Sequence, residues 1–177
     1  MAGIMGQKLR NKPWSKNTLV VTSDSDLAGM YAIDGDLRSR GCVGIFYSDM
    51  VVDYYSGWIG KLNSTGAAET WTLSTALRRA MHVKYIGEEM GIKMPRVISV
   101  YVDATVAIAF AADVGAPTGM KFIDLREGWV MDLRDRKKCQ VLKVDTILNP
   151  ADFGTKILTV KEFRRQRKYY LTPFNSN

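Results

Sequence analysis

An almost wholly apolar run, VISVYVD at residues 97–103, constrains the fold more than any other segment of the chain. A strand with one face in water alternates apolar and polar residues, whereas a continuous apolar run is typical of a parallel strand covered on both faces. We therefore expect this run to be a central strand. With 177 residues, 46% of them hydrophobic, the chain is long enough for one compact domain with a buried core.

The segment before this run predicts an antiparallel start to an α/β fold. Strands are expected at 18–24, 42–48 and 51–58, with a tight turn near residues 48–50 that makes the last two a hairpin. A long amphipathic helix is expected over 64–90, because this segment has no Pro and its apolar residues recur at helical spacing. After the central run we expect a short helix at 104–113, a helix at 121–136, a strand at 139–145 and a last helix from Pro150.

Four acidic residues lie where these elements begin or end. Asp24 closes the first strand, Glu69 lies in the opening turns of the long helix, Asp103 closes the central run and Asp152 begins the last helix. Carboxylates gathered at one point repel each other, which raises their pKa values unless a cation is present. Because oxygen ligands suit Mg²⁺ or Mn²⁺, the pattern predicts a two-metal site. For Asp152 an alternative stays open, in which it only stabilises the first turn of its helix.

The net charge of +7 is concentrated at the two ends of the chain. Residues 1–23 carry +4, and residues 156–177 carry six basic residues and one acid, or +5, which leaves −2 for residues 24–155. Basic ends on a nearly neutral core predict contacts to nucleic-acid phosphates, although such ends can also serve only solubility. The residues predicted to bind nucleic acid are Lys8, Arg10, Lys12, Lys16, Arg164, Arg165, Arg167 and Lys168. Four aromatic residues lie among these charges as base-stacking groups would, namely Trp14, Tyr169, Tyr170 and Phe174.

The domain organisation follows from this charge distribution. We expect a basic N-terminal extension at 1–17, a folded domain at 18–160 and a basic C-terminal extension at 161–177. Cys42 and Cys139 lack metal-ligand spacing, which argues against a zinc site or a disulfide framework and favours a reducing compartment inside the cell, mitochondrial, cytoplasmic or nuclear. No apolar run approaches a membrane span, so no membrane partner is expected.

His82, Cys42 and Cys139 are not expected to be catalytic. His82 is the single histidine and lies among packing residues of the long predicted helix. Neither cysteine has a histidine nearby in a motif, and cysteine is commonly a small buried hydrophobic residue. These three residues therefore offer no competing active site.

Six segments of the chain resemble, in order, the ribonuclease H domain of copia-type long-terminal-repeat retrotransposons. They are TSDSDLAG at 22–29, LRSRGCVGIFY at 37–47, STGAAE at 64–69, VYVDATVAIA at 101–110, FIDLREGWV at 122–130 and NPADFGTK at 149–156. The resemblance implies a ribonuclease H-like fold, with a five-stranded mixed sheet in the order 3-2-1-4-5 flanked by helices. It also implies that Asp24, Glu69, Asp103 and Asp152 bind two Mg²⁺ or Mn²⁺ ions and hydrolyse the RNA strand of RNA–DNA hybrids.

The chain departs from the family at four positions near these motifs. Ala67 replaces a Glu, Leu27 a Trp, Phe122 a His, and Ala104 a polar residue suited to touching the nucleic-acid backbone. These departures leave open whether the chain is a magnesium-dependent endoribonuclease. The chain begins at Met1 and has no room for a reverse transcriptase. The alternative is a domesticated, non-catalytic RNA-binding subunit of a ribonucleoprotein, such as a mitochondrial ribosome, with other proteins of that particle as partners.

Overall fold

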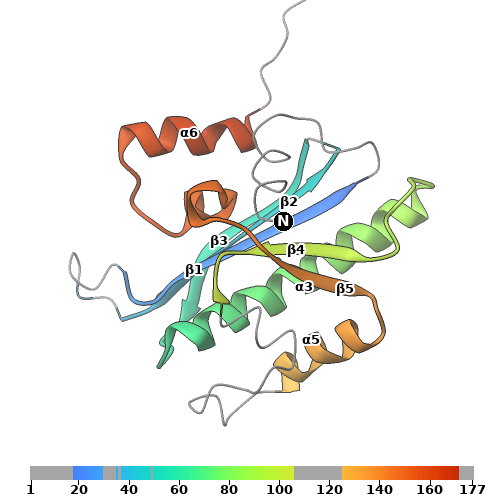
Figure 1. Ribbon diagram of the computed structural model, residues 1–177, viewed down its shortest axis with the longest axis horizontal. Coiled ribbons are helices and arrows are strands. Elements are labelled where there is room, and N and C mark those ends of the chain that lie inside the picture. Colours follow the sequence, from blue (N-terminus) through green and yellow to red (C-terminus); the bar gives the residue numbers. More distant parts are fainter. Residues whose placement is uncertain (1–17, 30–34, 36, 49, 106–124, 172–177) are drawn as a thin grey trace, which may run out of the picture.

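The computed structural model describes residues 18–29, 35, 37–48, 50–105 and 125–171. Its elements in chain order are β1 (Leu19–Asp26), β2 (Ser39–Tyr47), β3 (Met50–Gly60), α3 (Thr65–Glu89), β4 (Ile98–Val102), α5 (Leu125–Asp135), β5 (Cys139–Lys143), the short 3-10 helices η1 (Thr146–Leu148) and η2 (Pro150–Gly154), and α6 (Val160–Tyr170). The strands form one sheet in the order β3-β2-β1-β4-β5 (Figure 1). β1, β2 and β3 pair antiparallel, whereas β4 is parallel to both β1 and β5. The predicted fold class and strand order are confirmed.

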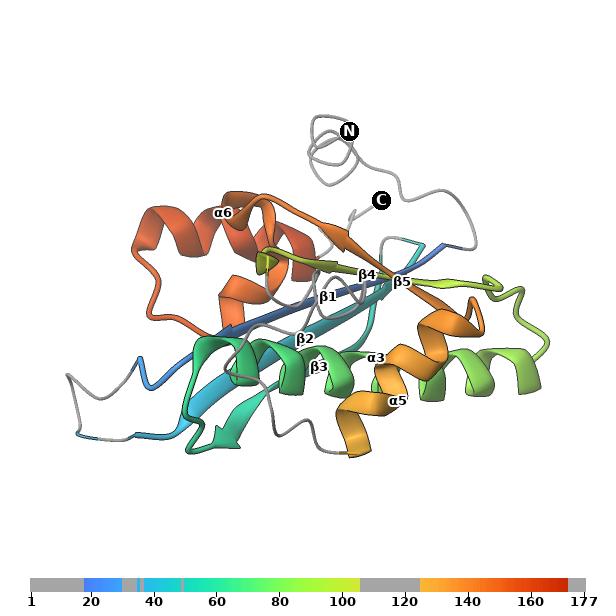
Figure 2. The ribbon, with the colours of Figure 1, turned by 60° about the horizontal axis from the view of Figure 1, so that its bottom comes forward.

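Helices cover the two faces of this sheet unequally. α3 and α5 lie side by side on one face, and α6 lies on the other (Figure 2). The α3 face holds the main core, in which β4 contributes Ile98, Val100 and Val102, each with none of its surface exposed. On the opposite face, Tyr101 packs with a small cluster that contains Tyr169 of α6. The prediction of a central strand over the apolar run is therefore confirmed.

The ends of α3 agree closely with the segment predicted to be a long helix. The Ser64 side chain caps its first turn by accepting a hydrogen bond from the backbone N–H of Ala67 at 3.1 Å. After the helix, Gly91 adopts a φ of 73°, a left-handed conformation that glycine tolerates better than other residues. The chain can therefore leave the helix here and enter β4.

Several predicted boundaries differ from the structure by one or two residues, and two starts were wrong by more than that. β2 begins at Ser39, three residues before the predicted start at Cys42, because Ser39, Arg40 and Gly41 all pair with β3. No α-helix begins at Pro150: the segment is the 3-10 helix η2, and the α-helix begins only at Val160. The later start follows from Thr159, whose side chain forms a capping box with Glu162. The predicted helix at 121–136 is seen as α5, and the one at 104–113 lies almost entirely outside the described residues.

α6 packs on the sheet through its aromatic and amide side chains. Tyr170 contacts the rings of Phe46, Tyr54 and Phe153, and its hydroxyl donates a hydrogen bond to the Pro150 carbonyl at 2.7 Å. The fully buried Gln166 donates from Nε2 to the Asn149 carbonyl at 3.1 Å. The prediction that Tyr170 stacks on bases was therefore wrong, because its ring packs within the protein. Trp14 and Phe174, predicted for the same role, lie outside the described residues.

We expect Tyr170→Ala to lower the free energy of unfolding by about 3 kcal/mol, because it deletes a packed ring and its hydrogen bond. Tyr170→Phe keeps the ring and should cost only about 1 kcal/mol. Urea unfolding followed by circular dichroism measures both values. The matched control is Tyr85→Ala, since the Tyr85 side chain is 56% exposed and should matter little. Equal losses for Tyr170→Ala and Tyr85→Ala would contradict this role of α6.

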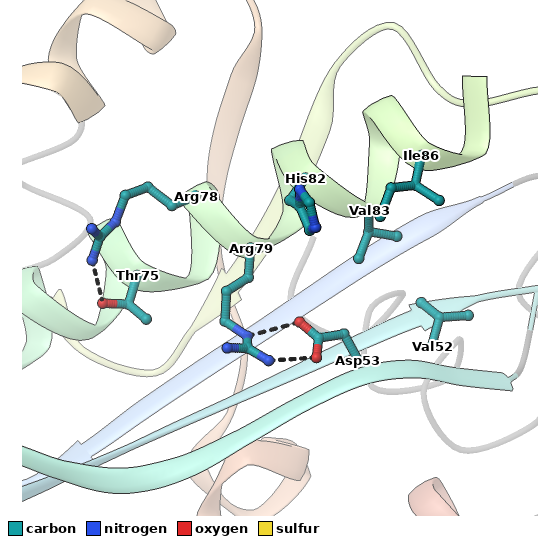
Figure 3. A pocket seen from close by; sticks show the side chains of 8 residues that line it. All are labelled: Val52, Asp53, Thr75, Arg78, Arg79, His82, Val83 and Ile86. Atoms are coloured by element: carbon teal, nitrogen blue, oxygen red, sulfur yellow. Dashed lines mark hydrogen bonds and ion pairs between the residues drawn. The ribbon is translucent and has the colours of Figure 1, made fainter. Parts of the chain in front are cut away.

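The edge strand β3 is fastened to α3 by an ion pair. Arg79 donates to both carboxylate oxygens of Asp53, at 2.7 Å from Nε and 2.5 Å from Nη2 (Figure 3). The pair lines a groove of about 560 Å³ whose other walls include Val52, Arg78 and His82. His82 is exposed on this groove, so the expectation that it packs inside was wrong. No described helix is long and apolar enough to span a membrane.

Candidate metal centre

Three of the four predicted acids meet at one end of the sheet. The parallel pairing of β1 with β4 places Ser23 opposite Val102, so the next residues, Asp24 and Asp103, lie at the same level. Glu69, in the second turn of α3, approaches them from the covered face. One carboxylate oxygen from each of the three residues lies within 4.8 Å of the other two. We call Asp24, Glu69 and Asp103 the carboxylate triad.

Burial makes two members of the triad hard to ionise. Asp24 is only 2% exposed, and burial raises its pKa to about 8, although Lys156 and a hydrogen bond from Thr155 oppose the rise. Burial likewise raises the pKa of Glu69 to about 7, with a smaller contribution from the nearby Asp103 charge. Both groups are therefore incompletely ionised at neutral pH, and a bound cation would favour their ionised forms.

The triad also fits a divalent cation by its hydrogen bonding. Oε2 of Glu69 is buried and has no hydrogen-bond partner among the described residues. A buried carboxylate oxygen without a partner costs free energy, and a bound cation would remove that cost. Since all three donors are carboxylate oxygens, they suit Mg²⁺ or Mn²⁺ rather than a softer metal.

The fourth acid, Asp152, lies beside the triad and is linked to it by a lysine. Asp152 is in the first turn of η2, and its Oδ1 accepts a hydrogen bond from Nζ of Lys156 at 2.6 Å. The same Nζ lies 3.6 Å from Oδ2 of Asp24. Burial alone would lower the pKa of Lys156, but Asp24 and Asp152 outweigh it and raise this pKa above its ordinary value. The lysine is therefore a fixed positive charge between two acids.

Residues of the NPADFGTK segment hold this arrangement in place. Thr155 donates from Oγ1 to Oδ2 of Asp24. Asn149 donates from Nδ2 to the Ser23 carbonyl at 3.0 Å and to Oδ1 of Asp103 at 3.5 Å. The sequence prediction took only Asp152 from this segment and missed Asn149, Thr155 and Lys156. The signal that could have found the last two is their spacing of three and four residues from Asp152.

η2 can lie this close to β2 because it ends in glycine. A Cβ at Gly154 would overlap the Tyr54 hydroxyl and the Cys42 sulfur. The Gly154 carbonyl instead accepts a hydrogen bond from the Ser56 hydroxyl at 2.6 Å. This close approach places Asp152 and Thr155 at the edge of the triad.

The other predicted residues fall into three groups. Arg164, Arg167 and Lys168 are exposed on α6 and Arg165 is half-buried there, whereas residues 1–17, with Lys8, Arg10, Lys12 and Lys16, lie outside the described residues. Of the positions that depart from the copia-type pattern, Ala104 packs against the core and Phe122 is not among the described residues.

Cys42 and Cys139 are free and buried, and burial raises their thiol pKa values to about 12 and about 11. Their burial agrees with the prediction that they are small buried hydrophobic residues.

Comparison with known proteins places this geometry in context. No family model matches the chain. The chain is 28% identical over 146 residues to the retrovirus-related Pol polyprotein from transposon TNT 1-94 of Nicotiana tabacum. The match covers 80% of the chain but only 10% of the polyprotein, so the chain spans about a tenth of that relative's length.

Solved structures match over more of their own length. LC11 ribonuclease H1, isolated from compost by a metagenomic approach, has a TM-score of 0.56 at 13% identity and covers 77% of this chain and 91% of its own. The N-terminal ribonuclease H domain of Rv2228c from Mycobacterium tuberculosis has a TM-score of 0.55 at 12% identity, covering 86% and 98%. The LC11 enzyme in complex with an RNA/DNA hybrid has a TM-score of 0.50 at 13% identity, covering 74% and 88%. These structures confirm the predicted ribonuclease H-like fold, and the sequence match confirms the resemblance to part of a retrotransposon Pol polyprotein.

Proposed function

We propose that this protein binds RNA–DNA hybrids and cleaves their RNA strand with the help of a divalent metal ion. The observation that carries the proposal is the carboxylate triad, in which three acids from three separate elements bring oxygens within 4.8 Å of one another. Glu69 adds an unpartnered buried oxygen to this triad. Such a concentration of negative charge is costly without a cation, which supports a metal-dependent site over a purely structural one.

Each residue around the triad has a defined task in this proposal. Asp24, Glu69 and Asp103 would hold the ion, which when bound activates a water molecule and stabilises the leaving oxygen at a phosphate. Lys156 favours the ionised form of Asp24, and Thr155 fixes its orientation by a hydrogen bond. Asn149 does the same for Asp103. We propose Mg²⁺ as the ion, with Mn²⁺ as its substitute.

The nucleic acid would extend from the triad toward α6. Lys161, Arg164 and Lys168 recur at three- and four-residue spacing on α6 and are exposed. η2, which carries Asp152, contacts both β1 and α6, so α6 lies close to the acidic site. The complex of LC11 ribonuclease H1 with an RNA/DNA hybrid supports this type of ligand. Lys8, Arg10, Lys12 and Lys16 remain candidates for further phosphate contacts.

We expect the double variant Arg164→Gln/Lys168→Gln to bind an RNA–DNA hybrid less tightly and with a weaker salt dependence. Removing one phosphate contact should lower the slope of log affinity against log salt by about one. Fluorescence anisotropy over a series of salt concentrations measures that slope. Lys93→Gln/Arg96→Gln is the matched control, because it removes the same charge from exposed residues that precede β4, away from Asp103. Identical slopes for the two double variants would contradict a role for α6.

The proposed function is tested by incubating the purified protein with a labelled hybrid, with Mg²⁺ or with EDTA. We expect cleavage of the RNA strand with Mg²⁺ alone, and none of the DNA strand. Hybrid binding without cleavage would overturn the hydrolase and favour the alternative, a non-catalytic RNA-binding subunit of a ribonucleoprotein such as a mitochondrial ribosome. Co-sedimentation with an RNA-containing particle in cell lysate would then identify that assembly.

A further inference from the structure

We propose that the ammonium group of Lys156 takes the place of a second divalent ion, so that this protein binds one divalent ion and not two. The inference rests on the proposed function and specifies its metal site. A two-metal site would place one ion on each side of Asp24. In this chain the side that faces Asp152 already holds a positive charge.

The contacts of Lys156 use the oxygens that an ion at that position would need. Nζ lies 2.6 Å from Oδ1 of Asp152 and 3.6 Å from Oδ2 of Asp24. A Mg²⁺ ion bridging these two acids would need oxygens at about 2.0–2.1 Å in near-octahedral geometry. The ammonium group and such an ion would compete for the same oxygens.

The carboxylate oxygens around Asp24 differ in whether they already have a hydrogen-bond or ion-pair partner. On the side of Asp152, Oδ2 of Asp24 accepts a hydrogen bond from Thr155 and lies near Lys156, and Asp152 is paired. On the other side, Glu69 is 5% exposed and its Oε2 has no partner among the described residues. The oxygens that face Lys156 are therefore already satisfied by the protein, whereas Oε2 of Glu69 is not.

The position of Lys156 in the chain makes this substitution stable. Lys156 follows Asp152 by four residues, and η2 is held on β2 by the close approach of Gly154. A lysine ammonium is a compact point charge with three donors, so it can serve two carboxylates at once. The charge of one lysine is half that of a divalent ion and does not fully neutralise Asp24 and Asp152. These two acids can therefore accept a further contact from a substrate.

The experiment is a Mn²⁺ titration of the full chain by isothermal calorimetry, with electron paramagnetic resonance to count bound ions. We expect one ion per chain in the wild type and in Lys156→Arg, which keeps the charge. Lys156→Met keeps the apolar stem but removes the charge, and should bind a second ion at least about tenfold more tightly than any second ion in the wild type. Lys93→Met, which alters an exposed lysine that precedes β4, should behave as the wild type.

The possible results separate this inference from the proposed function. Two ions of similar affinity in the wild type, or a single ion in a folded Lys156→Met variant, would overturn the role of Lys156 and leave the metal centre in place. A wild type that binds no Mn²⁺ would overturn the metal centre and this inference together. If Lys156→Met does not fold, the counts for the wild type and Lys156→Arg decide, because two ions in either contradict the inference.

Discussion

Asp24→Asn is expected to slow cleavage of an RNA–DNA hybrid by at least about a hundredfold. Loss of a group that only orients a metal ligand typically costs about 10- to 100-fold, and Asp24 is proposed to be a ligand itself. Asp24 is also the acid on which Thr155 and Lys156 converge. Asn keeps the size of the side chain but cannot supply the negative charge, so the loss should appear as a lower rate in Mg²⁺.

The control for this substitution is Asp145→Asn. Asp145 is exposed and its side chain makes no capping hydrogen bond to η1, so its replacement should leave the cleavage rate unchanged. Circular dichroism of both variants establishes that each is folded. An Asp24→Asn variant that cleaves at the wild-type rate would show that the carboxylate triad is not the catalytic site.

The second large effect concerns the stability of the metal-free protein between pH 5 and pH 8. Burial raises the pKa of Asp24 from 3.8 to about 8 and that of Glu69 from 4.5 to about 7. Well below pH 3.8 both acids are neutral in the folded and unfolded states, and folding incurs no ionisation cost. As the pH rises, the unfolded chain ionises first, so stability falls progressively until the pH passes the folded pKa values.

We therefore expect the thermal midpoint in EDTA to fall from pH 5 to pH 8. For Glu69 alone, the rise from 4.5 to about 7 corresponds to about 3 kcal/mol. Mg²⁺ should restore stability at pH 8, because it binds the ionised form, and should have little effect at pH 5. Differential scanning calorimetry of the wild type and of Asp24→Asn separates this effect from other titrating groups. A pH dependence that is the same in both proteins would contradict it.

The elements that could be predicted are those whose residue pattern lies within one short segment of the sequence. The apolar run at 97–103 indicates a buried strand wherever it lies, and the helix at 64–90 has both its periodicity and its Ser64 cap in the sequence. Asp24 and Asp103 were predictable because each directly follows an apolar run, and in the structure each directly follows the last residue of the parallel pairing between β1 and β4. Glu69 followed from its place in the first turns of the helix. The family motifs gave the same residues independently.

The features that escaped prediction depend on contacts between distant segments. Nothing around Lys156 shows that its ammonium reaches Asp24, which is 132 residues earlier in the chain. Tyr170 lies in a basic segment that by composition alone suits nucleic acid, yet its ring packs on Phe46 and Tyr54. A 3-10 helix at residues 150–154 is hard to predict because the same Asn-Pro start favours an α-helix. In each case tertiary packing decided between local structures of similar energy.

The placement of Lys156 and Thr155 late in the chain makes the order of synthesis matter. The three acids of the triad are made first, while the residues that neutralise and orient Asp24 emerge only with the segment 149–156, which packs against β2 and α6. A nascent chain that stops before this segment would hold buried acids with no internal cation. Such a chain should depend on dissolved metal ions to fold. A chain that includes Lys156 supplies part of the required positive charge from its own side chain.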